Sequence, residues 1–177
     1  MWVFGYGSLL WNPGFSPAEA VTARLDGYAR SFCMLSIHHR GTPDQPGLVL
    51  ALDTAPGDVC TGIALRVKPE EEAAVLAYLR ERELISSAYL ERQVPLALQD
   101  GREVVALAYV IDPEHRQYVL YDLERQAQMI AHAVGGRGPN HEYLTNTVAH
   151  LQTMGIDDPD LTWLTGRVAA LRRGAMT

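Results

Sequence analysis

Apolar and polar residues alternate over short stretches in the first two thirds of the chain, and such alternation predicts β-strands. A short apolar strand starts at Val3 and runs into the glycine-rich segment Gly5-Tyr6-Gly7. Further strands are predicted at residues 22–28, 30–35, 47–52, 59–67, 89–98 and 103–111. We expect the strands at 22–28 and 30–35 to pair with the opening strand. The last two strands should form a hairpin around Asp100-Gly101.

The last third of the chain has a helical pattern instead. A first helix, between the strands, is predicted from Lys68-Pro69 to about Glu83 or Leu84, because proline and acidic residues favour a first helical turn. Helices are then predicted at residues 123–134, at 140–154 and after Asp158-Pro159. Strands gathered first and helices last predict an α+β fold, in which a closed or nearly closed sheet is packed by helices.

Composition narrows the class of protein further. The 177 residues, 47% of them hydrophobic, suit a single domain over residues 1–177. A formal net charge of −6 leaves no basic stripe for nucleic acid or an anionic membrane, so we expect a small-molecule ligand and neither of those partners. Cys33 and Cys60 lack metal-type spacing and are expected to be buried and reduced. With no apolar run near the ~20 residues of a bilayer span, we expect a cytoplasmic protein.

The glycine-rich segment after the opening strand is a candidate binding site. Gly5 and Gly7 tolerate φ > 0, so successive amides there could converge on a carboxylate or phosphate. The alternative is a tight turn after an edge strand. Leu10 stands where both a dinucleotide fingerprint and a nucleophile elbow need glycine, which excludes those two motifs. Ser8 is therefore interpreted as a hydroxyl that donates to a ligand.

One carboxylate of the first predicted helix lies on the apolar face. Spacings of three, four and seven residues place Leu76, Leu79 and Glu83 on one stripe. Partial burial there would raise the pKa of Glu83, as a general acid or base needs near neutral pH. The alternative is that Glu83 pairs with Arg80 or Arg82 or reaches solvent.

The polar loop at residues 38–47 lies between two predicted strands, which is a usual place for binding groups. Adjacent residues on a strand point to opposite faces, so His38-His39 does not predict a metal site, and we expect no metal and no cofactor. Arg40 could clamp a carboxylate bidentately, or it could be a solvated loop charge.

Four stretches of the chain carry a resemblance when taken together. They are Trp2-Val3-Phe4-Gly5-Tyr6-Gly7-Ser8-Leu9-Leu10 with its continuation to Phe15, His39-Arg40-Gly41-Thr42-Pro43 with its continuation to Leu50, Tyr78-Leu79 with Arg82-Glu83, and Gly138-Pro139-Asn140 with Glu142-Tyr143-Leu144. In this order and spacing they resemble the ChaC family of glutathione-specific γ-glutamylcyclotransferases. The resemblance implies a γ-glutamylcyclotransferase-like fold, a small mixed barrel with helices around it.

The resemblance also implies a reaction and a set of site residues. Family members cleave glutathione to 5-oxoproline and cysteinylglycine, and Glu83 occupies the position of the catalytic glutamate. Arg40 and Tyr143 are the expected outer contacts to the substrate. The residues expected to bind the γ-glutamyl group are Val3, Phe4, Gly5, Tyr6, Gly7, Ser8 and Leu9.

One stretch departs from the family pattern. The family often has glycine before the tyrosine that follows the catalytic glutamate, whereas this chain has Ser86-Ser87-Ala88-Tyr89. Two alternatives to glutathione cleavage therefore stay open. One is a cyclotransferase for other γ-glutamyl amines or peptides, and the other is a regulator that binds γ-glutamyl compounds without catalysis.

Overall fold

The computed structural model describes residues 1–176 and divides into two compact units. The first unit consists of Met1–Ser31 and Ala51–Arg116, and the second of Phe32–Leu50 and the chain from Gln117 onward. Within the described chain, no helix combines the length and the apolar character that crossing a membrane requires.

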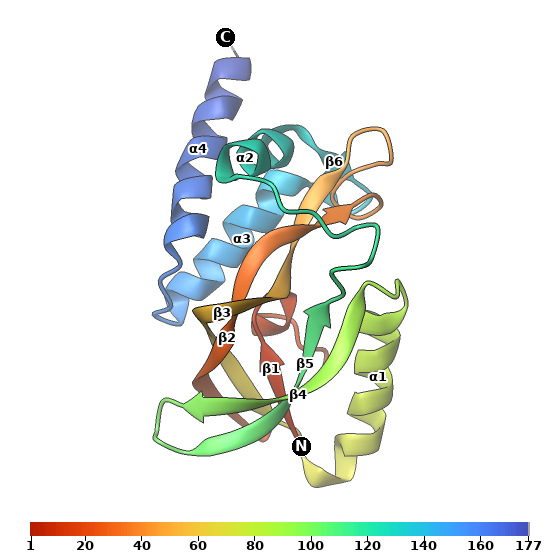
Figure 1. Cartoon of the computed structure of the whole chain (residues 1–177), viewed down its shortest axis with the longest axis vertical. Coiled ribbons are helices and arrows are strands. Elements are labelled where there is room, and N and C mark those ends of the chain that lie inside the picture. Colours follow the sequence, from red (N-terminus) through yellow and green to blue (C-terminus); the bar gives the residue numbers. More distant parts are fainter. Residues whose placement is uncertain (177) are drawn as a thin grey trace. The chain divides into compact units, whose positions relative to one another are not determined.

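The strands form a closed five-stranded barrel, in the order β1-β3-β2-β4-β5 (Figure 1). Their bounds are β1 (Trp2–Gly5), β2 (Glu19–Ser36), β3 (Gly47–Arg66), β4 (Tyr89–Leu98) and β5 (Glu103–Ile111). Closure comes from the parallel pairing of β1 with β5, where Trp2 lies opposite Ala106. Antiparallel β3 lies on the other side of β1, so the expectation that residues 22–35 pair with the opening strand is wrong. The predicted α+β fold with a closed sheet is confirmed.

Two of the strands are longer than the sequence pattern predicts. The predicted strands at 22–28 and 30–35 are both part of β2, and those at 47–52 and 59–67 are both part of β3. Gly27 and Gly57 lie within them at φ +84 and +88, a conformation that glycine adopts without steric cost. A glycine that looks like a break in the sequence therefore lets a strand change direction without ending. The predicted β4–β5 hairpin is confirmed, with Gly101 at φ +93 in its turn.

The first unit has apolar residues on both faces of β1. Phe4 belongs to one buried cluster with Leu25, Leu52 and Leu96. Val3, one residue earlier, points to the opposite face and packs with other buried residues, namely Leu65, Val67, Val75, Leu79 and Tyr109. Because Val75 and Leu79 belong to a helix, this second cluster fixes that helix against the sheet. Burial of a leucine such as Leu79 contributes roughly 1.5–3 kcal/mol.

That helix is α1 (Glu72–Leu84), which follows the short 3₁₀ helix η2 (Pro69–Glu71) and lies beside β4 in Figure 1. Its end at Leu84 confirms the prediction. Ser87 follows at φ 60, and its amide donates to the Leu84 carbonyl at 3.1 Å. A serine therefore occupies the left-handed position that glycine usually takes after a helix.

The second unit contains three helices that pack against one another (Figure 1). They are α2 (Leu123–His132), α3 (Asn140–Thr153) and α4 (Pro159–Ala175). Asp122 and Asp158 cap α2 and α4, because their side chains accept hydrogen bonds from the amides of Arg125 and Leu161. The helix predicted at residues 123–134 ends at His132, and β6 (Val134–Gly135) pairs with β7 (Gly138–Pro139) between α2 and α3.

Candidate active site

The opening strand leads into the segment from Tyr6 to Asn12, called the opening loop below. It contains the 3₁₀ helix η1 (Ser8–Leu10), in which the Leu10 amide donates to the Gly7 carbonyl at 2.9 Å. The Asn12 amide donates to the Ser8 carbonyl, also at 2.9 Å. The amides of Ser8 and Leu9 begin this turn, so they have no partner within it. They are the amides that the loop can offer to an anion.

The glycines of this segment do not act as the sequence predicted. Neither Gly5 nor Gly7 has a positive φ, and Gly7 lies at φ −132. Gly5 ends β1 opposite Ile63, where a Cβ would lie 3.0 Å from the Ile63 Cγ2 atom and 3.3 Å from Leu9. Glycine at position 5 therefore permits close packing of the loop on β3 rather than a left-handed turn.

The side chains of the opening segment are mostly used inside the first unit. Val3, Phe4 and Leu9 are buried, so a ligand could reach only their backbone. The Tyr6 hydroxyl donates to the Tyr109 carbonyl at 3.0 Å. The Ser8 hydroxyl oxygen accepts a hydrogen bond from Arg82, and its predicted donation to a ligand stays a prediction.

A buried arginine lies beneath the loop, and the sequence analysis missed it. Arg30 of β2 is 8% exposed, and its Nε donates to the Tyr6 carbonyl at 2.6 Å. Its Nη2 donates to the Thr61 carbonyl of β3. The guanidinium fixes the start of the loop and places a positive charge under it. An arginine inside an apolar strand was the only signal in the sequence.

Glu83 lies on the apolar face of α1, as predicted. Leu79, one turn earlier, is fully buried, and the Glu83 side chain is only 14% exposed. Burial raises the pKa of Glu83, and the positive charge of Arg82 opposes that rise. The predicted raised pKa is thus confirmed, together with the alternative that Glu83 pairs with Arg82. The pairing is a single contact of 3.4 Å between Arg82 Nε and Glu83 Oε1.

Arg82 connects Glu83 to the opening loop. Its Nη2 donates to the Ser8 Oγ atom at 2.8 Å, and its Nη1 donates to the Asn12 carbonyl at 2.6 Å. Residues 70 and more positions apart in sequence therefore meet at one guanidinium. The first unit brings the predicted base and the predicted binding loop together.

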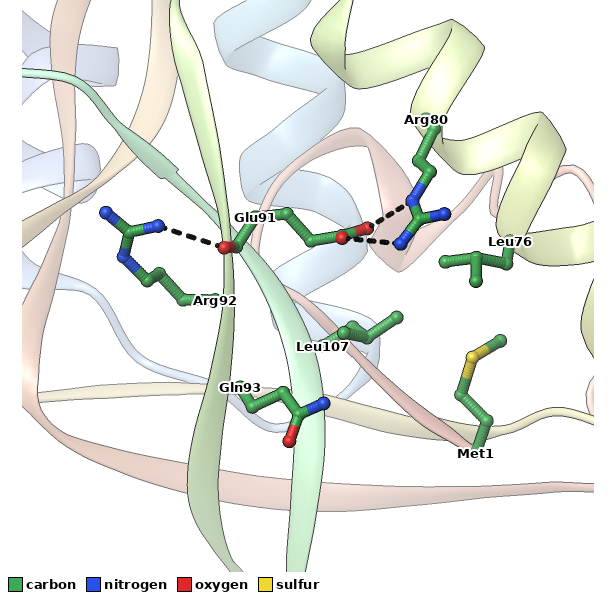
Figure 2. A pocket seen from close by; sticks show the side chains of 7 residues that line it. All are labelled: Met1, Leu76, Arg80, Glu91, Arg92, Gln93 and Leu107. Atoms are coloured by element: carbon green, nitrogen blue, oxygen red, sulfur yellow. Dashed lines mark hydrogen bonds and ion pairs between the residues drawn. The ribbon is translucent and has the colours of Figure 1, made fainter.

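The neighbouring arginine of α1 does not contact Glu83. Arg80 donates two hydrogen bonds to the Glu91 carboxylate of β4, at 3.1 and 3.0 Å (Figure 2). The Tyr109 hydroxyl donates a third, at 3.0 Å, and these bonds lower the pKa of Glu91. A pocket of about 340 Å³ lies beside this pair, lined by Met1, Leu76, Arg80, Glu91, Arg92, Gln93 and Leu107.

The other two predicted site residues, Arg40 and Tyr143, lie together in the second unit. The Arg40 guanidinium carbon is 5.7 Å from the centre of the Tyr143 ring, and its Nη1 donates to the Pro139 carbonyl at 3.2 Å. The Tyr143 hydroxyl accepts a hydrogen bond from the Leu50 amide at 3.2 Å, and the ring meets Phe32 edge-on at 6.0 Å. Tyr143 therefore also makes packing contacts within the second unit.

Asn140 is a second residue that the sequence analysis did not single out. It is fully buried, and its side-chain amide forms two hydrogen bonds of 2.8 Å with the backbone of Leu48. One is accepted from the Leu48 amide and the other is donated to the Leu48 carbonyl. Asn140 thus ties the first turn of α3 to the start of β3. Its place in the Gly138-Pro139-Asn140 stretch was the available signal.

The described residues contain no group of three or more His, Cys, Asp or Glu side chains that could hold a metal ion. Cys33 and Cys60 are buried, as predicted, and they do not form a disulfide with each other.

The fold is that of a γ-glutamyl cyclotransferase. A crystal structure of a γ-glutamyl cyclotransferase specific to glutathione from yeast has a TM-score of 0.86 to this chain, at 26% identity, covering 97% of this chain and 96% of that one. The chain belongs to the ChaC-like protein family, whose family model matches residues 1–171.

The names of similar curated proteins are consistent with this family. The chain is 40% identical over 163 residues to the glutathione-specific γ-glutamylcyclotransferase of Escherichia coli (strain K12), covering 91% of this chain and 69% of that protein. It is 34% identical over 175 residues to γ-glutamylcyclotransferase 2-3 of Arabidopsis thaliana, covering 95% and 88%. It is also 34% identical to the human glutathione-specific γ-glutamylcyclotransferase 1, covering 88% and 71%.

Proposed function

We propose that this protein is a glutathione-specific γ-glutamylcyclotransferase, which cleaves glutathione to 5-oxoproline and cysteinylglycine. Membership of the ChaC-like family and the activity named for several relatives support the proposal. The structural observation that carries it is Glu83, a mostly buried carboxyl with a raised pKa, which Arg82 connects to the Ser8 hydroxyl of the opening loop.

The substrate carries its own nucleophile in this reaction. The α-amine of the glutamyl unit attacks the γ-carbonyl carbon, a C–N bond forms to close a five-membered lactam, and the C–N bond to cysteine breaks. An α-ammonium has three protons and the lactam nitrogen keeps one, so two protons pass to the departing cysteinyl nitrogen. No water and no redox partner enter the balance. The protein has to hold the glutamyl chain folded and move two protons.

Glu83 is proposed as the group that moves them. It takes a proton from the α-ammonium and gives a proton to the leaving nitrogen, acting first as base and then as acid. A pKa raised by burial suits both steps, because it makes the carboxylate a stronger base toward the α-ammonium. Folding the substrate so that amine and carbonyl meet contributes several kcal/mol more through effective molarity.

The opening loop is proposed to hold the α-carboxylate of the substrate. The amides at the start of η1 and the Ser8 hydroxyl supply the donors, and buried Arg30 beneath the loop adds a favourable positive charge. Arg40 and Tyr143 remain the proposed contacts to the outer part of the substrate. The glycine carboxylate of glutathione calls for a positively charged partner, and the Arg40 guanidinium is such a cation.

Three broader proposals accompany the activity. The whole chain is proposed to act as one domain, which the family match over residues 1–171 supports. The cytoplasm is the proposed location, since Cys33 and Cys60 are buried and not joined by a disulfide, which suits a reducing compartment. A net charge of −6 supports a small-molecule substrate rather than nucleic acid.

The test is to incubate the purified protein with reduced glutathione, without added metal or cofactor, and to follow 5-oxoproline and cysteinylglycine by mass spectrometry. Glutaryl-cysteinylglycine is the matched control substrate, because it keeps the amide but lacks the α-amine. We expect products from glutathione, none from the control, and no ¹⁸O in 5-oxoproline formed in labelled water. Cleavage of the control would indicate hydrolysis instead. Faster reaction of γ-glutamyl amines than of glutathione would contradict the proposed specificity.

A further inference from the structure

Arg82 has a partner at each nitrogen of its guanidinium. Nε lies 3.4 Å from Glu83 Oε1, and Nη2 donates to Ser8 Oγ at 2.8 Å. Nη1 donates to the Asn12 carbonyl at 2.6 Å and to the Tyr78 hydroxyl at 3.1 Å. The side chain is 20% exposed, although arginines in the last turn of a helix usually extend into solvent. This guanidinium is therefore enclosed by the groups that it joins.

A second contact holds the same two segments together. Gly14, just beyond the opening loop, lies at φ +82, and a Cβ built on it would overlap the Tyr78 hydroxyl. The chain after the loop thus lies directly on Tyr78 of α1, the residue one helical turn before Arg82. Backbone, hydroxyl and guanidinium contacts together attach residues 8–14 to the last two turns of α1.

The geometry of the substrate makes this attachment important. The α-carboxylate and the α-amine of a glutamyl group are bonded to the same carbon. A protein that binds the carboxylate on the loop must therefore hold its base within hydrogen-bond reach of a nitrogen only two bonds from the carboxylate carbon. The separation between the opening loop and Glu83 must then be fixed closely, since a misplacement of 1 Å can cost about 10²-fold in rate.

We propose that Arg82 is the positioning residue of this site: it fixes the opening loop against the end of α1 and so sets the separation between the substrate-binding amides and Glu83. The inference rests on the proposed function for its effect on turnover. The attachment itself is a property of the protein alone and can be measured without substrate.

Arg82 has a second effect, on the charge of Glu83. Its positive charge lowers the pKa of Glu83, against the larger rise caused by burial. On the sheet side Tyr109 of β5 faces the pair, and its own pKa is raised by burial, by Glu91 and by Glu83, so it remains a neutral phenol near pH 7. Removing the charge of Arg82 should therefore raise the pKa of Glu83 further.

Two substitutions separate positioning from charge. Arg82→Lys keeps a cation but cannot form the planar fork that reaches Ser8 and Asn12 together. Arg82→Met removes both the fork and the charge while keeping an unbranched apolar stem. Arg80→Met is the matched control, because it removes an arginine of the same helix that contacts Glu91 and not Glu83.

The experiment combines three measurements on these variants: glutathione turnover, hydrogen exchange of the amides in residues 6–14, and NMR titration of the Glu83 carboxyl carbon. In both Arg82 variants we expect kcat to fall about 10²-fold with KM changed only several-fold, and loop amides to exchange faster. The Glu83 midpoint should rise in Arg82→Met and stay near the native value in Arg82→Lys. Arg80→Met should leave all three measurements near native.

The outcomes distinguish this inference from the proposed function. Native loop protection and native turnover in both Arg82 variants would overturn it. Slower turnover with native hydrogen exchange in residues 6–14 would mean that Arg82 acts only through its charge, and this result would also contradict a positioning role. If the native protein does not cleave glutathione, the proposed function fails, while faster loop exchange in both Arg82 variants, with a risen Glu83 midpoint in Arg82→Met, would still support Arg82 as the attachment. Thermal unfolding of each variant checks that the fold is retained.

Discussion

The carboxylates of Glu83 and Glu91 both contact arginines of α1, yet their environments shift their pKa values in opposite directions. Glu91 has its pKa lowered by hydrogen bonds from Arg80 and Tyr109, whereas Glu83 has its pKa raised by burial. The exposed fractions of the two side chains, 21% and 14%, are similar. Desolvation nevertheless has the largest influence on the pKa of Glu83, whereas at Glu91 the hydrogen bond from Arg80 outweighs it.

Hydrogen bonding separates the two carboxylates. Glu91 accepts three hydrogen bonds of about 3 Å, which stabilise its charged form, while Glu83 has one contact of 3.4 Å to a guanidinium already shared with three other oxygens. Hydrogen bonds to a carboxylate stabilise its charged form and lower its pKa. A carboxyl that is buried and accepts few hydrogen bonds keeps its proton more readily. Counting arginines near a glutamate does not predict which case applies.

The largest expected effect is on turnover. Glu83→Gln keeps the size of the side chain but removes its proton transfer, so we expect glutathione cleavage to fall by at least about 10²-fold. Glu91→Gln, the matched control, should keep most of the activity because Glu91 is bonded to Arg80 and Tyr109. Product formation is measured by mass spectrometry, and glutathione binding by calorimetry.

Binding should survive in Glu83→Gln even though turnover does not. Equal loss of activity in both variants would contradict the distinction between the carboxylates. Native activity in Glu83→Gln would remove Glu83 as the base.

A smaller effect is expected on stability, with opposite dependence on pH. The folded pKa of Glu83 lies above its unfolded value near 4.5, so its contribution is full below pH 4.5 and is lost as pH rises through the folded pKa. The folded pKa of Glu91 is lowered, so its contribution is present above pH 4.5 and is lost as pH falls through the folded pKa. Each pKa unit corresponds to about 1.4 kcal/mol.

Urea unfolding between pH 3 and pH 8 measures this difference. Near pH 8, Glu83→Gln should be more stable than the native protein, and Glu91→Gln less stable by about 1 kcal/mol. Both differences should shrink at the acidic end. Parallel curves for the two variants would show that the environments do not differ as described.

The smallest effect concerns the turn that ends α1, the helix that supplies both arginines. Ser87 lies at φ 60, which costs a non-glycine residue roughly 1–2 kcal/mol. Ser87→Gly should therefore stabilise the protein by about 0.5–1 kcal/mol, partly offset by the flexibility of glycine in the unfolded chain.

Thermal unfolding measures this gain, with Ser86→Gly as the control. The Ser86 hydroxyl accepts a hydrogen bond from the Ala88 amide at 3.3 Å, so its removal should destabilise slightly. A loss of stability in Ser87→Gly would mean that the serine contributes more than its backbone conformation costs.

Local patterns in the sequence predicted much of the fold. The bounds of β4 and β5, the end of α1 and the partial burial of Glu83 follow from periodicity and turn chemistry within a few residues. The lengths of β2 and β3 did not: in β3, Gly57 lies between the two predicted strands and has the sequence character of a turn. The pairing of β1 with β3 and β5 depends on contacts between residues 58 to 104 positions apart, which no local pattern contains.

The sequence predicted the central carboxylate of the candidate site but not the arginine contacts around it. Glu83 was found because a carboxylate breaks the apolar stripe of a helix. The contact of Arg82 with Ser8 and the role of Arg30 were missed because Ser8 and Tyr6 lie 74 and 24 residues away from these arginines. The left-handed glycines expected in the opening loop were wrong, since Gly5 serves close packing on Ile63 instead.

Asn140 also bears on the behaviour of the protein at high concentration. Strand edges with unpaired backbone groups are templates for strands of other molecules, and natural proteins cover them. At Leu48, the amide and the carbonyl are both occupied by one buried side chain of α3. A foreign strand could not pair there without first displacing the start of that helix. The asparagine thus protects the beginning of β3 from aggregation, because its side chain makes the two backbone hydrogen bonds that a neighbouring strand would otherwise make.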